Sequence, residues 1–291
     1  MKIIVRAVLS VALVLQIGTL NAQGRADIVQ PRIVESMPFE LTAGFLISVK
    51  GRIGDQDGLD FILDTGATAS IVDRKVAMKV PITLHKDRVF TFQKFIEVER
   101  AEFSEIQFGP IKAQNVSLMV ADLAKTSAFA NHAAAIIGLD LLSLSKTVSI
   151  DYKTSTVSFL AFESDKSAYH SRARVPQCFT SNFMIQGHPV RLLIDTGMGE
   201  VLLYENRLRK EVPDLRLSGR TRKVHVGWVQ ARAVTLPKVD WKESDAPMDV
   251  LLADGPAEGV LPGIDGFLGP ATLKARIVEF DFERKVLSLR W

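Results

Sequence analysis

The sequence predicts an all-β protein made of two copies of one unit, and three observations support this fold class. An apolar stretch ends in Asp-Thr-Gly twice, at residues 61–66 and at residues 192–197. Further along the chain, two apolar residues and a glycine follow each triplet, and the spacing from the Asp to that glycine is identical in both copies. Each such glycine precedes a short helical stretch and then two strand-like segments. Because the triplets and the glycines recur at one constant offset, an internal duplication explains them.

Each Asp-Thr-Gly triplet comes directly after apolar residues. Phe61-Ile62-Leu63 leads into Asp64, and Leu192-Leu193-Ile194 leads into Asp195. A charge at the end of a buried strand must be paired or hydrogen-bonded. At ordinary residue usage the triplet arises by chance roughly once in several thousand positions. Two copies in the same context therefore indicate a shared chemical role.

In these triplets, and in the segments Ile136-Ile137-Gly138 and Phe267-Leu268-Gly269, the chain resembles the aspartic proteases. The resemblance is to the retropepsin-like (retroviral-type) group, with two lobes in a single chain, and it covers roughly residues 35–291. It implies a bilobal aspartic-protease (pepsin/retropepsin-like) fold with internal pseudo-twofold duplication. In that fold the apolar-apolar-Gly strand passes beneath the catalytic loop.

The resemblance also implies the roles of the triplet residues. Asp64 and Asp195 would form the catalytic dyad, and the hydroxyls of Thr65 and Thr196 would bond across to the opposite lobe. Two adjacent carboxylates cannot both ionise readily, so they share one proton. The ionised partner takes a proton from a water that attacks the peptide carbonyl, and the protonated partner bonds the carbonyl oxygen. This chemistry requires neither a metal nor an organic cofactor, and we expect none.

Gly66 and Gly197 complete the two triplets. We expect them to support the loops in two ways: by letting backbone approach the carboxylates closely, and by adopting turn conformations closed to other residues.

The start of the chain, residues 1–22, has the order of a secretory signal peptide. Lys2 and Arg6 precede the apolar run Ala7–Leu15, and a less apolar end follows at Gly18–Ala22. A membrane anchor is the alternative, but the run is well short of the roughly 20 apolar residues that a spanning helix needs. We therefore expect an exported protein, periplasmic or secreted, with no stable membrane anchor after cleavage.

The rest of the chain divides into two lobes and a linker. We expect the first lobe at 35–162, the linker at 163–176 and the second lobe at 177–291. The linker interrupts the apolar pattern and is rich in charge and serine. Since one chain carries both Asp residues, we expect an active monomer.

Composition excludes several classes of function. The formal net charge is only +3, and no basic block or Gly-rich phosphate loop points to nucleic acid or nucleotide. The single cysteine, Cys178, excludes an intramolecular disulfide and a cysteine zinc cluster, and we interpret it as a small buried hydrophobe. The five histidines share no ligand spacing. Gly54–Gly58 faintly resembles a calcium loop, but an Asp-Gly hairpin turn is the better interpretation.

Further elements follow from apolar alternation and breaker residues. In the first copy we expect a strand at Phe39–Lys50, a short helix within Ser70–Val80, strands at Phe103–Phe108 and Asn115–Ala121, a helical connection at Leu123–Ala135, and paired strands at Thr147–Tyr152 and Thr156–Phe162. In the second copy we expect a strand at Phe179–Gln186, a turn at Gly187–Pro189, a strand at Val190–Ile194, and paired strands at Arg276–Phe282 and Val286–Trp291.

Two hairpins are candidates for flaps that close over a substrate. Val89–Val98 contains two strand-like segments that meet near Gln93 and Lys94, and Val224–Val234 has Gly227 and Trp228 at its tip. An ordinary surface hairpin is the alternative for the first, and simple aromatic packing is the alternative for Trp228.

The function that the sequence predicts is an exported aspartic endopeptidase acting on peptide or protein substrates. Met198 stands where the family usually has a small residue after the triplet. A first alternative is therefore a non-catalytic module that binds extended peptides on the same fold. A second alternative is an unrelated duplicated β-domain, for instance a carbohydrate-binding one, in which Asp64 and Asp195 would lie far apart.

Overall fold

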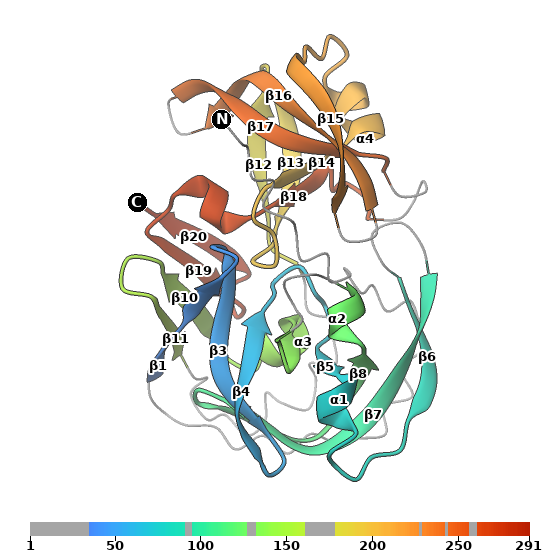
Figure 1. Cartoon of the computed structure of the whole chain (residues 1–291). Helices are drawn as coiled ribbons and strands as arrows, with labels where there is room; N and C mark the ends of the chain where they lie inside the picture. The colour runs from blue at the N-terminus through green and yellow to red at the C-terminus, as the bar shows by residue number, and fades with distance from the viewer. Residues whose placement is uncertain are drawn as a thin grey trace.

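The computed structural model describes residues 35–90, 95–126, 132–160, 178–226, 229–241, 244–255 and 261–291. Figure 1 shows two lobes, each built on one large sheet, and a smaller sheet beside them that contains both chain halves. The expected signal peptide (residues 1–22) and the expected linker (163–176) lie outside the described residues.

The first lobe is an eight-stranded sheet in the order β2-β3-β4-β9-β5-β8-β7-β6, with an additional pairing of β3 and β7. Parallel neighbours occur at β4–β9 and β5–β8, and the other pairs are antiparallel. Its strands are β2 (Glu40–Thr42), β3 (Leu46–Ile53), β4 (Gln56–Leu63), β5 (Ile71–Asp73), β6 (His85–Phe90), β7 (Phe95–Phe108), β8 (Ile111–Ala121) and β9 (Ala135–Ile137).

The second lobe is a seven-stranded sheet in the order β12-β13-β18-β14-β17-β16-β15, with an additional pairing of β12 and β16. This order repeats that of the first lobe from β3 to β6, strand for strand, including the parallel pairs and the extra pairing. The duplication predicted from the sequence is therefore confirmed in the topology. The strands are β12 (Thr180–Ile185), β13 (His188–Ile194), β14 (Val201–Tyr204), β15 (Ser218–Val226), β16 (Val229–Trp241), β17 (Ser244–Ala253) and β18 (Gly266–Leu268).

A five-stranded antiparallel sheet joins the two halves of the chain. Its order is β1-β11-β10-β19-β20. The pairing of β10 with β19 joins one strand of each half, with Thr147 opposite Asp281. The hairpins expected after each apolar-apolar-Gly segment are found here, so the duplication contributes one hairpin to each side of the joint. The strands are β1 (Glu35–Pro38), β10 (Thr147–Asp151), β11 (Thr156–Leu160), β19 (Ile277–Asp281) and β20 (Val286–Arg290).

The helices are short. They are α1 (Arg74–Ala77), α2 (Leu123–Thr126), α3 (Leu139–Leu142), α4 (Glu205–Glu211) and the 3₁₀ helix η2 (Pro270–Leu273). The two expected after the apolar-apolar-Gly segments are α3 and η2. Within the described ranges no helix has the length and apolar character needed to cross a membrane.

Two element predictions were wrong in extent. The expected strand Phe39–Lys50 is interrupted between β2 and β3 by a turn in which Ala43 and Gly44 both have positive φ, at 54° and 79°. The expected helical connection Leu123–Ala135 contains α2, but its described end is not helical, since Ala135 already begins β9. At this end, helix propensity yields to the parallel pairing of β9 with β4, which buries apolar side chains.

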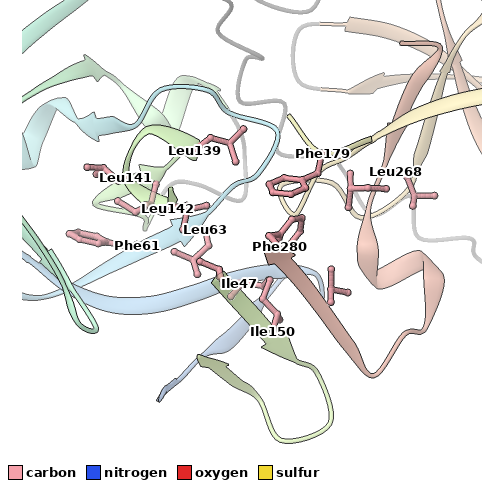
Figure 2. Close-up of a cluster of buried hydrophobic side chains, with 14 of the residues drawn as sticks. Ile47, Phe61, Leu63, Leu139, Leu141, Leu142, Ile150, Phe179, Leu268 and Phe280 are labelled. Atoms are coloured by element: carbon pink, nitrogen blue, oxygen red, sulfur yellow. The ribbon is translucent and has the colours of Figure 1, made fainter. Parts of the chain in front are cut away.

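The largest core cluster extends through both halves of the chain. Figure 2 shows part of it, with Ile47 and Leu63 of the first lobe, Ile150 of the joining sheet, and Phe179 and Phe280 of the second half. The rings of Phe179 and Phe280 meet edge to face at a centroid distance of 5.1 Å. Burying each such side chain contributes about 1.5–3 kcal/mol. The lobes are therefore held together by shared packing as well as by the covalent chain.

Candidate active site

The two Asp-Thr-Gly loops begin where β4 and β13 end. β9 runs parallel to β4, and β18 runs parallel to β13, so each apolar-apolar-Gly segment lies directly beside a loop. The amide of Asp64 donates to the carbonyl of Ile137 (2.9 Å), and the amide of Asp195 donates to the carbonyl of Leu268 (3.0 Å). The backbone of each Asp is therefore held by the neighbouring buried strand.

The two threonines connect the loops. The hydroxyl of Thr65 donates to the carbonyl of Ile194 (2.9 Å), and the hydroxyl of Thr196 donates to the carbonyl of Leu63 (2.8 Å). Each hydroxyl also accepts from the other threonine's amide, at 3.0 and 3.1 Å. Both side chains are buried. In each of these four bonds the donor lies in one loop and the acceptor in the other. Because the groups are buried and need a partner, the bonds fix the loops face to face.

The two glycines act through close approach alone. An ideal Cβ on Gly66 would lie 2.6 Å from Oδ1 of Asp195 and closer still to its Cγ and Oδ2. On Gly197 it would lie 2.7 Å from Oδ2 of Asp64. Neither glycine is among the residues with positive φ. The prediction that they adopt conformations closed to other residues was therefore wrong, because the constraint is steric contact with the opposite carboxyl group.

The carboxyl groups of Asp64 and Asp195 lie side by side, and each alters the pKa of the other. Both residues are almost completely inaccessible, with exposed fractions of 0% and 1%. Oδ1 of Asp64 accepts from the amides of Gly66 (2.8 Å) and Ala67 (3.1 Å), and Oδ1 of Asp195 accepts from the amide of Gly197 (2.7 Å). This adjacency contradicts the alternative of an unrelated β-domain with separated carboxylates.

Burial raises the pKa of both carboxyl groups above the ordinary range of aspartic acid. For Asp64 the loss of hydration is the largest cause, and bonds from Asp195, Gly66 and Ala67 oppose it. For Asp195 the loss of hydration is again the largest cause, and the charge of Asp64 raises its pKa further. The pair therefore holds a proton at a pH where exposed aspartates are fully ionised.

The residues after each glycine donate no side-chain hydrogen bond. Ala67 and Met198 are both buried. Oδ2 of Asp64 is also buried and receives no bond from a backbone or hydroxyl donor of the described residues, which leaves the Asp195 carboxyl as its polar neighbour. The hydroxyl of Thr68 is buried and has no hydrogen-bond partner in the described part of the chain, so it makes no bond to Asp64.

The four candidate flap residues, Gln93, Lys94, Gly227 and Trp228, lie outside the described residues. The strands of both hairpins are described, with Phe90 paired to Phe95 and Val226 paired to Val229. Val89 belongs to the same apolar cluster as Ala67, and Ala231 to the same cluster as Met198. The base of each hairpin is thus part of the core that supports one loop, and the flap role itself stays a prediction.

Cys178 lies close to the two carboxyl groups, half-buried and packed against the core. Burial, the largest cause, and the nearby charges of Asp195 and Asp64 raise the pKa of its thiol to about 12, so the thiol is neutral. Over the described ranges, no group of three or more His, Cys, Asp or Glu side chains is placed to hold a metal ion.

The sequence analysis did not predict one polar pair that lies beside the first loop. Asp140 follows the buried strand β9 at the start of α3, and its carboxylate bonds the side chain of Ser70. The signal was present in the sequence, because Asp140 comes shortly after the apolar run Ala135–Ile137, as Asp64 follows Phe61–Leu63. An acid in that context requires a buried partner.

Comparison with protein-family models matches residues 49–141 to the family described as "Aspartyl protease". Comparison with curated protein sequences gives no significant match. Among solved structures, the chain is similar to an aspartic proteinase from Irpex lacteus, at 14% identity and a TM-score of 0.47. That similarity covers 89% of this chain and 97% of the other.

The matched residues include β4, the first Asp-Thr-Gly loop, β9 and most of α3. They therefore contain the first half of the site, and the duplicated second lobe contains the other half. Residues 49–141 therefore match the aspartyl protease family, and the described residues form a bilobal all-β fold.

Proposed function

We propose that the chain is an exported, monomeric aspartic endopeptidase in which Asp64 and Asp195 activate a water molecule. One observation carries this proposal: two buried carboxyl groups from duplicated loops lie side by side, and burial raises the pKa of both. At a pH between their two titration steps the pair holds one proton and one charge. Such a pair contains a general base and a general acid at one point.

The chemistry follows from that protonation state. The ionised carboxylate removes a proton from water, which attacks the carbonyl carbon of an extended peptide. The protonated carboxyl group donates a hydrogen bond to the carbonyl oxygen, and a proton then passes to the leaving amine. The threonine bonds between the loops keep the two groups in register, which lowers the cost of reorganisation during the reaction.

Export is proposed from the signal-like order of residues 1–22, and a monomer is proposed because one chain supplies both carboxyl groups. The shared core and the pairing of β10 with β19 support a compact active monomer.

The proposal is tested by incubating purified mature protein with a peptide library and identifying new termini by mass spectrometry. We expect internal cleavage, and specific activity that does not change on dilution. Halves of the chain separated within residues 163–176 should be inactive alone, since each holds one carboxyl group. Binding of library peptides without any cleavage would support the non-catalytic peptide-binding module instead. Activity that falls on dilution, in step with a dissociating dimer, would contradict the monomer.

A second test concerns the pH dependence of the reaction. Because burial raises both pKa values, we expect kcat/KM to peak at weakly acidic to near-neutral pH. In Ala67→Ser, a hydroxyl on the segment that already bonds Asp64 can donate to the carboxylate. A bond to the charged form lowers the pKa of the pair, so the acidic limb should move down by roughly half to one pH unit. An unmoved or upward-shifted limb in a folded, active variant would contradict this assignment.

A further inference from the structure

A half-buried acid that the proposed chemistry does not use lies directly beside the first loop. The carboxylate of Asp140 accepts three hydrogen bonds, from the amide of Ser70 (2.9 Å), the hydroxyl of Ser70 (2.6 Å) and the amide of Leu141 (2.9 Å). A carboxylate that accepts several bonds is stabilised in its charged form even where burial opposes it. Burial is the largest influence on its pKa and raises it, while these bonds and the charge of Arg100 act in the opposite direction.

The Ser70–Asp140 pair is bonded to the same loop that carries Asp64. The hydroxyl of Ser70, besides donating to Asp140, accepts from the amide of Gly138 (2.9 Å). The amide of Leu139 donates to the carbonyl of Ala67 (2.8 Å). The segment from Ala67 to Ser70 is therefore bonded at both ends to the junction of β9 and α3.

The second lobe has no such pair. The equivalent positions of the second copy, at the constant offset of the duplication, are Val201 and Ala271, which cannot form it. There the amide of Gly269 donates to the main-chain carbonyl of Glu200 (3.0 Å), in place of a serine hydroxyl. The duplication thus supplies an internal comparison between a loop with the polar pair and a loop without it.

The two carboxyl groups differ in the same way. Asp64 accepts from the amides of both Gly66 and Ala67. Within its own loop the carboxylate of Asp195 accepts only from Gly197, and the amide of Met198 donates to the main-chain carbonyl of Asp195 (3.1 Å). The amide of Ala67 also reaches the main-chain carbonyl of Asp64 (3.3 Å), but it lies closer to the carboxylate (3.1 Å). The amide of Gly66 acts on Asp195 from the opposite loop. The amide of the residue after the glycine therefore reaches its own loop's carboxylate only in the lobe that contains the Ser70–Asp140 pair.

We propose that Ser70 and Asp140 are positioning residues that hold the amide of Ala67 on Asp64 and so make Asp64 the charged partner of the pair. Asp195 then carries the shared proton. This inference rests on the proposed function, because it assigns the base and the acid of that reaction. Neither positioning residue touches the reacting atoms, and both act through the backbone of the first loop.

The test variant is Ser70→Ala, which changes no formal charge. The ionisable groups near Asp64 are Asp195 and the neutral thiol of Cys178, and the cation of Arg100 acts on Asp140. All of these groups remain in the variant. Losing the hydroxyl loosens the segment that presents the Ala67 amide, so the charged form of Asp64 is less stabilised. The pKa of the Asp64–Asp195 pair must then rise, which is opposite in sign to the effect of Ala67→Ser.

We expect the acidic limb of kcat/KM for Ser70→Ala to move up by roughly half to one pH unit, with kcat reduced and KM little changed. Ser70→Thr keeps the hydroxyl, so the acidic limb of its pH profile should lie at the wild-type pH. The matched control is Val201→Ala, at the equivalent buried position of the second lobe. It should lower the Tm by removing packing, but leave the limb unmoved.

The titration of the pair is also followed by ¹³C NMR of labelled aspartate, which needs no turnover. A wild type that cleaves no peptide would overturn the proposed function, while the NMR titration of Ser70→Ala would still decide the positioning role. An unchanged titration in a folded Ser70→Ala protein, or an equal shift in Val201→Ala, would overturn the positioning role of Ser70 and Asp140.

Discussion

Asp64→Asn and Asp195→Asn are each expected to lower kcat/KM by roughly 10³-fold or more, since each removes either the base or the acid of the proposed reaction. An amide cannot take a proton from water, and it cannot pass one to the leaving amine. The double variant should be no worse than either single one, because residues that act as one unit have non-additive effects. The measurement is kcat/KM on a peptide identified in the library experiment.

Stability should change little in these variants. The amide oxygen of an asparagine at residue 64 can still accept from the amides of Gly66 and Ala67, and the side-chain volume is nearly the same. The control is Asp60→Asn on the same strand, β4. Asp60 forms a surface ion pair with Lys50 (2.6 Å), and such pairs contribute only about 0–1 kcal/mol. Appreciable turnover in Asp64→Asn or Asp195→Asn, or an equal loss in Asp60→Asn, would contradict the two-carboxylate mechanism.

Gly66→Ala is expected to be nearly as damaging to activity, although it leaves both carboxyl groups in the chain. The new Cβ would lie 2.6 Å from Oδ1 of Asp195, well inside van der Waals contact, so the carboxyl group or the loop must move. The threonine bonds oppose movement of the loop. We expect kcat/KM to fall by about 10²-fold or more, since a displacement near 1 Å can cost that much. Overpacking should also cost about 1–3 kcal/mol of stability.

Gly187→Ala is the matched control for this prediction. Gly187 has a φ of +85°, and no atom lies within 4 Å of an ideal Cβ there. Its substitution therefore costs about 1 kcal/mol or more in backbone strain without touching the carboxyl groups. We expect lower Tm in both variants, measured by thermal unfolding, and loss of activity only in Gly66→Ala. A Gly66→Ala protein with near wild-type kcat/KM would show that the close approach is not required.

Several strands could be predicted from the alternation of apolar and polar residues, because this pattern is carried by residues that are neighbours in the sequence. The alternating segments became β10, β11, β19 and β20. The hairpin turn expected within Gly54–Gly58 lies at Gly54-Asp55, and the Asp57-Gly58 pair on which the prediction rested lies inside β4. The short buried strands β5 and β14 were missed. A three- or four-residue apolar strand has no room for alternation, and only its pairing with β9 or β18 distinguishes it from a loop.

By itself, the sequence determined that the protein is a duplicated β-protein with two Asp-Thr-Gly loops, because repeats and buried apolar runs are properties of the chain order. Only the tertiary structure decided that the two carboxyl groups share one buried site, that Gly66 and Gly197 are required by contact across the lobes, and that Ser70 and Asp140 bond to the first loop alone. These facts depend on distances between residues 70 to 131 positions apart in the chain. Such distances are set by sheet pairing and by shared core packing, neither of which acts between neighbours along the sequence.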